Sequence, residues 1–306
     1  MKKIIILGFL ALLIGSMASC SSENSSSIVL EKAKERREIQ NNKELFEGVL
    51  FFNREKKSEN QPKQTILDEK EEVSDEFFDR SFKLVFFGDS LTQGVGDNTG
   101  NGGFTSFVKE HYASKPLIEN VSVTNLGVRG NRTSHLLNRL KKPEVQESLQ
   151  LADVIFITVG GNDLMKVIRE NFLDLNFKLF EKEQVEYAER LTTVLTEVRE
   201  LNPDSTIYLV GVFNPFHEFF KDIPEMNQVV ENWNGTSAAV LANYSKTAFI
   251  PIQDIFIDSA EYLLGDDQFH PNDKGYRLIG DEIVKNIIIY NQENLLDADF
   301  EMLERE

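Results

Sequence analysis

Short apolar runs alternate with amphipathic stretches along the chain from residue 82 onward. Five runs are rich in β-branched and aromatic residues and read as strands: FKLVFF, NVSVTNL, DVIFITVG, STIYLVGV and TAFIPI. Between them apolar residues recur at helical spacing, for example from Ala188 to Leu201 and from Met226 to Tyr244. Nearly continuous apolar strands that alternate with helices predict a parallel sheet covered on both faces. We therefore predict an α/β fold with three layers, α/β/α, around a five-stranded parallel sheet.

The segments on either side of this pattern have a different composition. Residues 21–81 are polar and charged, with few recurring apolar positions, which predicts a tether without a fold of its own. Residues 291–306 end in DADFEMLERE and read as an acidic, solvated tail. The catalytic or binding chemistry is therefore expected in a single domain over residues 82–290.

The first residues have the composition of an export signal. Lys2 and Lys3 precede an apolar run from Ile4 to Ile14, which is shorter than the roughly 20 residues that a membrane-spanning helix needs. Cys20 is the only cysteine, so no intramolecular disulfide forms, and its place resembles the lipobox of bacterial lipoproteins. We expect residues 1–19 to be a lipoprotein-type signal peptide, Cys20 to be lipidated, and the protein to be exported and anchored on the outer side of the cell membrane. Cleavage by ordinary signal peptidase after residue 18 or 19, or a retained signal anchor, are the alternatives.

Charge excludes some classes of partner. The formal net charge is −17, from 33 basic and 50 acidic residues. A protein that binds nucleic acid without sequence preference needs basic side chains facing phosphates, and adsorption to anionic lipid needs them too. We therefore expect no nucleic-acid partner and no membrane contact beyond a lipid anchor.

Residues suited to nucleophilic catalysis follow the predicted strands. Ser90 follows the first strand in GDSL, Gly130 the second in NLGVRGNRT and Asn162 the third in GGND, and His270 comes after the fifth in DDQFHPND. Because ligands bind at the carboxyl ends of the strands in such sheets, we expect these residues to meet at one rim.

A serine nucleophile needs a base and an oriented carboxylate. His270 is the candidate base, and Asp267, three residues earlier, can hold its imidazole. Asp266 is a competing carboxylate at an offset of four. Pro271 suits the first turn of the final helix, which predicts an accessible His270 at or just before that helix. The oxyanion needs donors, which the N–H groups of Ser90 and Gly130 and the amide of Asn162 could supply.

Together these blocks resemble the signature blocks of the SGNH (GDSL-type) hydrolase superfamily, in order, over about residues 82–290. The resemblance is closest to the bacterial lipoprotein lipase/acylhydrolase type. It implies a flavodoxin-like sheet and catalysis without a metal or other cofactor. It also implies Ser90 as nucleophile, His270 as base and Asp267 as its orienter, with Ser90, Gly130 and Asn162 as the oxyanion hole. Arg129 and Asn131 stand where serine and aspartate are frequent in relatives.

Two other hydrolase classes fit the sequence poorly. The Gly-x-Ser-x-Gly elbow of α/β-hydrolases would need glycine where Thr92 stands. His111, His135 and His217 form no H-E-x-x-H pattern, and there is no cysteine pair, which disfavours a zinc hydrolase.

The stretch FNPFHEFF follows the fourth strand and should lie on the same rim. Its aromatic residues could line an acyl-binding groove or form a lid, or could simply pin the loop to the core. The candidate pocket residues are Phe213, Phe216, Phe219 and Phe220.

The sequence thus predicts an extracytoplasmic serine esterase or acylhydrolase, anchored to the membrane by lipid, that cleaves carboxylic esters through an acyl-enzyme on Ser90. Two alternatives remain open. One is a deacetylase of acetylated cell-wall or surface carbohydrate that uses the same residues. The other is a non-catalytic envelope binding or scaffold lipoprotein on a hydrolase fold.

Overall fold

The computed structural model describes residues 81–303 apart from 172, 175 and 218–223. All the described residues belong to one compact unit. The predicted export signal, Cys20 and the predicted tether up to residue 80 lie outside the described residues.

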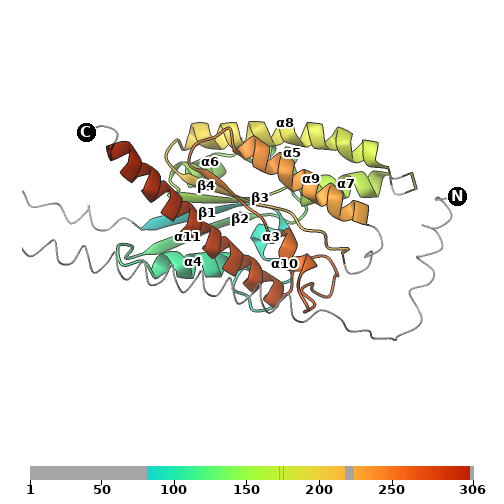
Figure 1. The fold of residues 1–306 in the computed structure, drawn as a ribbon, viewed down its shortest axis with the longest axis horizontal. Helices are drawn as coiled ribbons and strands as arrows, with labels where there is room; N and C mark the ends of the chain where they lie inside the picture. The colour runs from blue at the N-terminus through green and yellow to red at the C-terminus, as the bar shows by residue number, and fades with distance from the viewer. Residues whose placement is uncertain (1–80, 172, 175, 218–223, 304–306) are drawn as a thin grey trace, which may run out of the picture. The chain divides into compact units, whose positions relative to one another are not determined.

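Five parallel strands form one sheet in the order β2-β1-β3-β4-β5 (Figure 1). The chain runs from β1 to β2 on one side and then crosses β1 to reach β3. This reversal makes the carboxyl end of β1 a topological switch point, where such sheets open a crevice. The strands are β1 (Phe82–Gly88), β2 (Val121–Gly127), β3 (Val154–Thr158), β4 (Thr206–Val210) and β5 (Thr247–Ile250).

Helices cover both faces of the sheet, and Figure 1 shows the three layers with α8 and α9 on one side and α4 and α11 on the other. The predicted α/β/α architecture is therefore confirmed. The first layer comprises α5 (Thr133–Arg139), α6 (Pro143–Gln150), α7 (Gly161–Glu170), α8 (Phe177–Leu201) and α9 (Pro224–Leu241). The second comprises α4 (Thr105–Ala113), α10 (Gln253–Ile257) and α11 (Asp273–Leu303).

Strand β1 shows why the central strands are apolar throughout. Val85 and Phe87 pack into the core beneath α8, whereas Leu84 and Phe86 pack into the core beneath α11, and all four are 0–2% exposed. Successive side chains of a strand point to opposite faces, so a strand buried on both faces needs apolar residues at every position.

Helix α11 runs past the predicted domain end at residue 290. Residues 291–303, expected to form a separate acidic tail, continue the helix without a break. The segment from 281 to 303 contains neither glycine nor proline, so its sequence carries no signal that would end the helix. Within the described residues, no helix is both long enough and apolar enough to span a membrane.

Candidate active site

Ser90 lies at the turn from the buried strand β1 into the short helix α3 (Ser90–Gln93). Asp89 caps this helix: its Oδ1 accepts a hydrogen bond from the Leu91 N–H at 3.0 Å. Gly94 ends the helix with a φ of 80°, in the left-handed conformation. The Ser90 N–H belongs to the first turn of the helix, whose N–H groups have no intrahelical acceptor. The turn thus presents both the hydroxyl and a backbone donor at the switch point.

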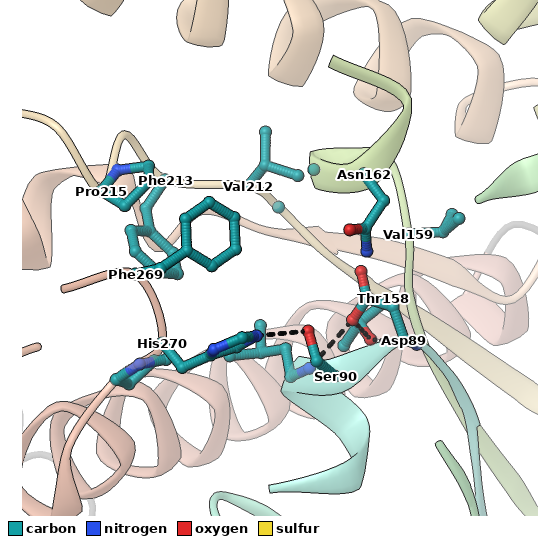
Figure 2. Close-up of a pocket in the computed structure, with 14 residues that line it drawn as sticks. Asp89, Ser90, Thr158, Val159, Asn162, Val212, Phe213, Pro215, Phe269 and His270 are labelled. Atoms are coloured by element: carbon teal, nitrogen blue, oxygen red, sulfur yellow. Dashed lines mark hydrogen bonds between the residues drawn. The ribbon is translucent and has the colours of Figure 1, made fainter. Parts of the chain in front are cut away.

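A chain of hydrogen bonds links Ser90, His270 and Asp267. His270 Nε2 lies 2.9 Å from Ser90 Oγ (Figure 2), and His270 Nδ1 lies 2.5 Å from Asp267 Oδ2. Asp267 Oδ1 also accepts from the backbone N–H of His270 at 2.9 Å. The competing carboxylate, Asp266, is exposed. This is the arrangement of a nucleophile, a base and an orienting carboxylate.

His270 is buried, with 6% of its surface exposed, so the expectation of an accessible histidine is wrong. Pro271 does not open the final helix, which begins at Asp273; it forms an antiparallel bridge with Leu264 instead. This bridge folds the loop back, so that His270 and Pro271 pack against Gly96 in the segment after Ser90. A Cβ on Gly96 would lie 2.3 Å from Pro271 O, so only glycine fits this close approach.

The carboxyl group of Asp267 has a pKa below its usual value. Its partial burial acts to raise the pKa, but hydrogen bonds from the His270 N–H and from the His270 ring lower it and prevail. The Arg129 guanidinium lies 3.6 Å from Asp267 Oδ2, at an exposed position. Asp267 is therefore ionised at neutral pH and can accept a hydrogen bond from the Nδ1–H of the imidazole.

Asp89 connects the turn that carries Ser90 to the neighbouring strand β3. Its Oδ1 accepts a hydrogen bond from the Thr158 hydroxyl at 2.8 Å, and this hydroxyl contacts Thr92 Oγ1, also at 2.8 Å. Burial raises the pKa of the Asp89 carboxyl to about 6, although the hydrogen bonds from Thr158 and Leu91 oppose the rise. These contacts fix the turn to strand β3.

Two of the three predicted oxyanion donors, Gly130 and Asn162, lie on neighbouring segments. Gly130 has a φ of 80° in the loop between β2 and α5, and in the described part of the chain nothing accepts a hydrogen bond from its N–H. Asn162 lies in the first turn of α7 and lines the cavity beside Ser90 (Figure 2). Its amide donates one hydrogen bond to Asn131 O at 3.1 Å and keeps a second N–H. Gly130 does not line that cavity.

A buried polar cluster ties these two segments together, and nothing in the sequence pattern signalled it. Asp163 accepts hydrogen bonds from the N–H of Thr133 and, at 2.6 Å, from its hydroxyl. Arg190, on α8, donates to Thr133 Oγ1 at 2.8 Å, to Asp163 at 3.2 Å and to Glu183 at 2.6 Å. Burial raises the pKa of Asp163, against the effect of hydrogen bonds from Thr133 and of the Arg190 charge. We call Thr133, Asp163, Glu183 and Arg190 the clamp.

A cavity of about 60 Å³ opens beside Ser90, and its walls are mostly apolar. Phe213 lines it and stacks on Phe256, with ring centres 3.8 Å apart. Phe216 lines an adjoining hollow instead. Phe219 and Phe220, the other two candidate pocket residues, lie outside the described residues.

The remaining histidines lie away from Ser90. His111 lies on α4, the Nδ1 of His135 accepts from the Arg132 N–H at 3.0 Å, and His217 contacts Asn227 at 3.1 Å. Among the described residues, no group of three or more histidine, cysteine, aspartate or glutamate side chains is placed to hold a metal ion.

A hydrogen-bonded serine, histidine and aspartate is the arrangement that serine hydrolases share, and here it lies at the carboxyl ends of an all-parallel sheet. The chain belongs to the GDSL-like Lipase/Acylhydrolase family, whose model matches residues 86–278, and it is a serine ester hydrolase. The resemblance read from the sequence is thereby confirmed.

Among curated proteins, the uncharacterized protein YpmR of Bacillus subtilis is 37% identical over 67% of this chain and 80% of its own length. The spore germination lipase LipC of Bacillus licheniformis is 27% identical over 66% of this chain and 95% of its own length.

Two solved structures share the fold. The lipase Lip_vut3 from a goat rumen metagenome superposes with a TM-score of 0.60 and 24% identity, over 66% of this chain and 96% of its own. A variant of Axe2, an acetylxylan esterase from Geobacillus stearothermophilus, superposes with a TM-score of 0.51 and 19% identity, over 67% of this chain and 94% of its own.

Proposed function

We propose that this protein is an exported, membrane-tethered serine esterase that cleaves carboxylic esters through an acyl-enzyme on Ser90. The observation that carries the proposal is the hydrogen-bonded chain from Asp267 through His270 to the Ser90 hydroxyl. Each member has the partner that its role requires, at hydrogen-bonding distance.

The first half of the reaction forms the acyl-enzyme. His270 Nε2 takes the Ser90 Oγ proton as Oγ attacks the ester carbonyl, and a C–O bond forms while the carbonyl electrons move to oxygen. Asp267 accepts a hydrogen bond from the Nδ1–H of His270 and so stabilises the imidazolium. The tetrahedral intermediate collapses, and His270 gives its proton to the departing alcohol.

The second half repeats these steps with water. His270 takes a proton from water, the hydroxide adds to the acyl carbon, and collapse returns the proton to Ser90 Oγ and releases the acid. In both halves the oxyanion is stabilised by the N–H of Ser90, the N–H of Gly130 and the amide of Asn162. The position of Asn162 in the wall of the cavity beside Ser90 supports this role.

A second candidate is a deacetylase of acetylated carbohydrate, since the same residues would serve and the acetylxylan esterase Axe2 shares the fold. The apolar cavity walls and the similarity to the lipase LipC favour the esterase. A purely binding role is disfavoured because every position of the catalytic chain is filled.

The test is hydrolysis of p-nitrophenyl esters by the purified full-length chain beside Ser90→Ala. We expect a fall of at least 10³-fold in kcat, about the contribution of a catalytic nucleophile, and mass spectrometry should find an acyl group on the peptide that contains Ser90. The matched control is Asp266→Asn, an exposed neighbour of Asp267, which should keep wild-type kcat. Equal rates for wild type and Ser90→Ala would refute the mechanism.

The tether is tested separately. Cys20→Ala should block lipid attachment, so that the protein is released into the medium or keeps its signal peptide, as cell fractionation and gel mobility would show. Unchanged membrane attachment and mobility in Cys20→Ala would refute lipidation.

A further inference from the structure

A second hollow of about 30 Å³ adjoins the cavity beside Ser90. The two share the walls formed by Gly161, Val212, Phe213, Pro215 and Phe269. The side chains that line the second hollow alone are mostly apolar and come from α7, the loop after β4, and α9. They are Leu164, Met165, Phe216, Met226 and Val230, together with Asn214.

We propose that this second hollow binds the distal part of the acyl chain and makes the enzyme selective for medium-chain acyl esters, of about six carbons, over acetyl esters. The proposal rests on the proposed esterase function and names the substrate class of that site.

The direction of the acyl chain follows from the groups around Ser90. A carbonyl carbon bonded to Ser90 Oγ places its leaving oxygen near His270 Nε2, which must protonate it, and its oxyanion near Asn162. Figure 2 shows His270 and Asn162 on different sides of Ser90 Oγ, with Val212 across the cavity. The remaining substituent, the acyl chain, is therefore directed towards Val212, which is a wall of both hollows.

The volumes of the two hollows set the length of the acyl chain that they can hold. A water-sized group needs about 10–15 Å³ of such space, so the first hollow holds roughly four to six groups and the second roughly two or three. The carbonyl group and the first carbons fill the first hollow. The second hollow then takes the end of a chain of about six carbons.

The chemistry of the walls favours a hydrocarbon. Among the described residues that line the second hollow, Asn214 has the only polar side chain. It is already paired, because its amide donates to Asn227 at 2.7 Å and its carbonyl accepts from the Phe216 N–H at 2.9 Å. A sugar hydroxyl placed there would lose its hydrogen bonds to water without replacement. Met165 and Met226 are unbranched and flexible, so they can adjust to a chain.

Aromatic rings form the wall that the two hollows share. Phe213 is stacked on Phe256 with ring centres 3.8 Å apart, whereas Phe269 is half-buried, meets Phe216 with a ring separation of 6.3 Å and packs edge-on against His270 at 5.0 Å.

The test compares kcat/KM for p-nitrophenyl acetate, butyrate, hexanoate and dodecanoate in the full-length chain. Each methylene buried contributes a factor of about four, so hexanoate, with four more methylenes, should exceed acetate by roughly 250-fold, with no further gain at dodecanoate. Met165→Trp, which fills the second hollow, should lower the hexanoate-to-acetate ratio by about tenfold or more. Arg169→Trp places the same side chain at an exposed position of α7 and should keep the ratio.

Each outcome decides the proposal. If Met165→Trp does not fold, Met226→Phe fills the hollow from α9 instead and should lower the same ratio. A wild-type enzyme that hydrolyses acetate best, or a ratio unchanged in the filled variants, would overturn the subsite while leaving the esterase function intact. A folded wild type that hydrolyses no ester would overturn both.

Discussion

Asp89→Asn should remove a pH dependence of stability that the buried carboxyl imposes. The pKa of Asp89 is about 6 in the folded protein, against 3.8 for the same carboxyl exposed to water in the unfolded chain. Between these values the folded state holds more protons than the unfolded state, so the free energy of unfolding falls as pH rises from about 4 to about 6 and is level above that. The difference of about two pKa units corresponds to about 3 kcal/mol.

The substitution is conservative in shape. Asparagine keeps the Oδ1 acceptor that Thr158 and Leu91 use, and it carries no titratable proton. The free energy of unfolding of Asp89→Asn relative to wild type should therefore rise by about 3 kcal/mol between pH 4 and pH 7, because only wild type loses stability from this group.

Urea unfolding of both proteins at several pH values measures this difference. The contributions of the other titrating groups to the free energy of unfolding cancel, because both proteins share these groups. A difference for Asp89→Asn that is flat with pH would show that burial does not penalise the Asp89 charge and would refute the reasoning.

Substitutions at three further positions probe the site. Asp267→Asn should lower kcat by about 10³–10⁴-fold, measured by steady-state ester hydrolysis, because the imidazole loses its orienting carboxylate; wild-type kcat would contradict this. Gly130→Ala should cost about 1–2 kcal/mol in urea unfolding and lower kcat, since a residue with a side chain is strained at φ 80° although the Cβ itself meets no atom; unchanged stability would rule out the strain. Arg190→Met should destabilise the fold by about 3 kcal/mol by leaving Asp163 without its cation, and Arg190→Lys should recover part of it.

The sequence predicted the parts of the molecule that have local signals. The central strands β1, β3 and β4 were readable because strands buried on both faces need unbroken apolar runs. The edge strands β2 and β5 are more exposed and were readable from their β-branched and aromatic residues, and the fold class followed from the order of all five. Ser90, Asp267 and His270 were readable as candidates because each follows a strand or precedes the last helix, and the topology brings such positions to one rim.

Long-range packing explains what the sequence did not predict. The clamp joins Thr133, Asp163 and Arg190 across separations of 27 to 57 residues, so no local spacing marks it. The burial of His270 depends on the bridge between Leu264 and Pro271, whereas the proline alone suggested the start of a helix. Helix α11 continued past residue 290 because acidic composition suggests solvation but does not end a helix.

The two residues whose side chains meet at the reacting atoms, Ser90 and His270, are 180 positions apart in the chain. Ser90 follows the first strand of the domain, and His270 follows the last. A chain that ends just before residue 270 contains all five strands of the sheet, yet it lacks the histidine that acts as base for its serine. Hydrolytic activity therefore becomes possible only when the last tenth or so of the chain has joined the domain, which makes turnover itself a readout of completed folding.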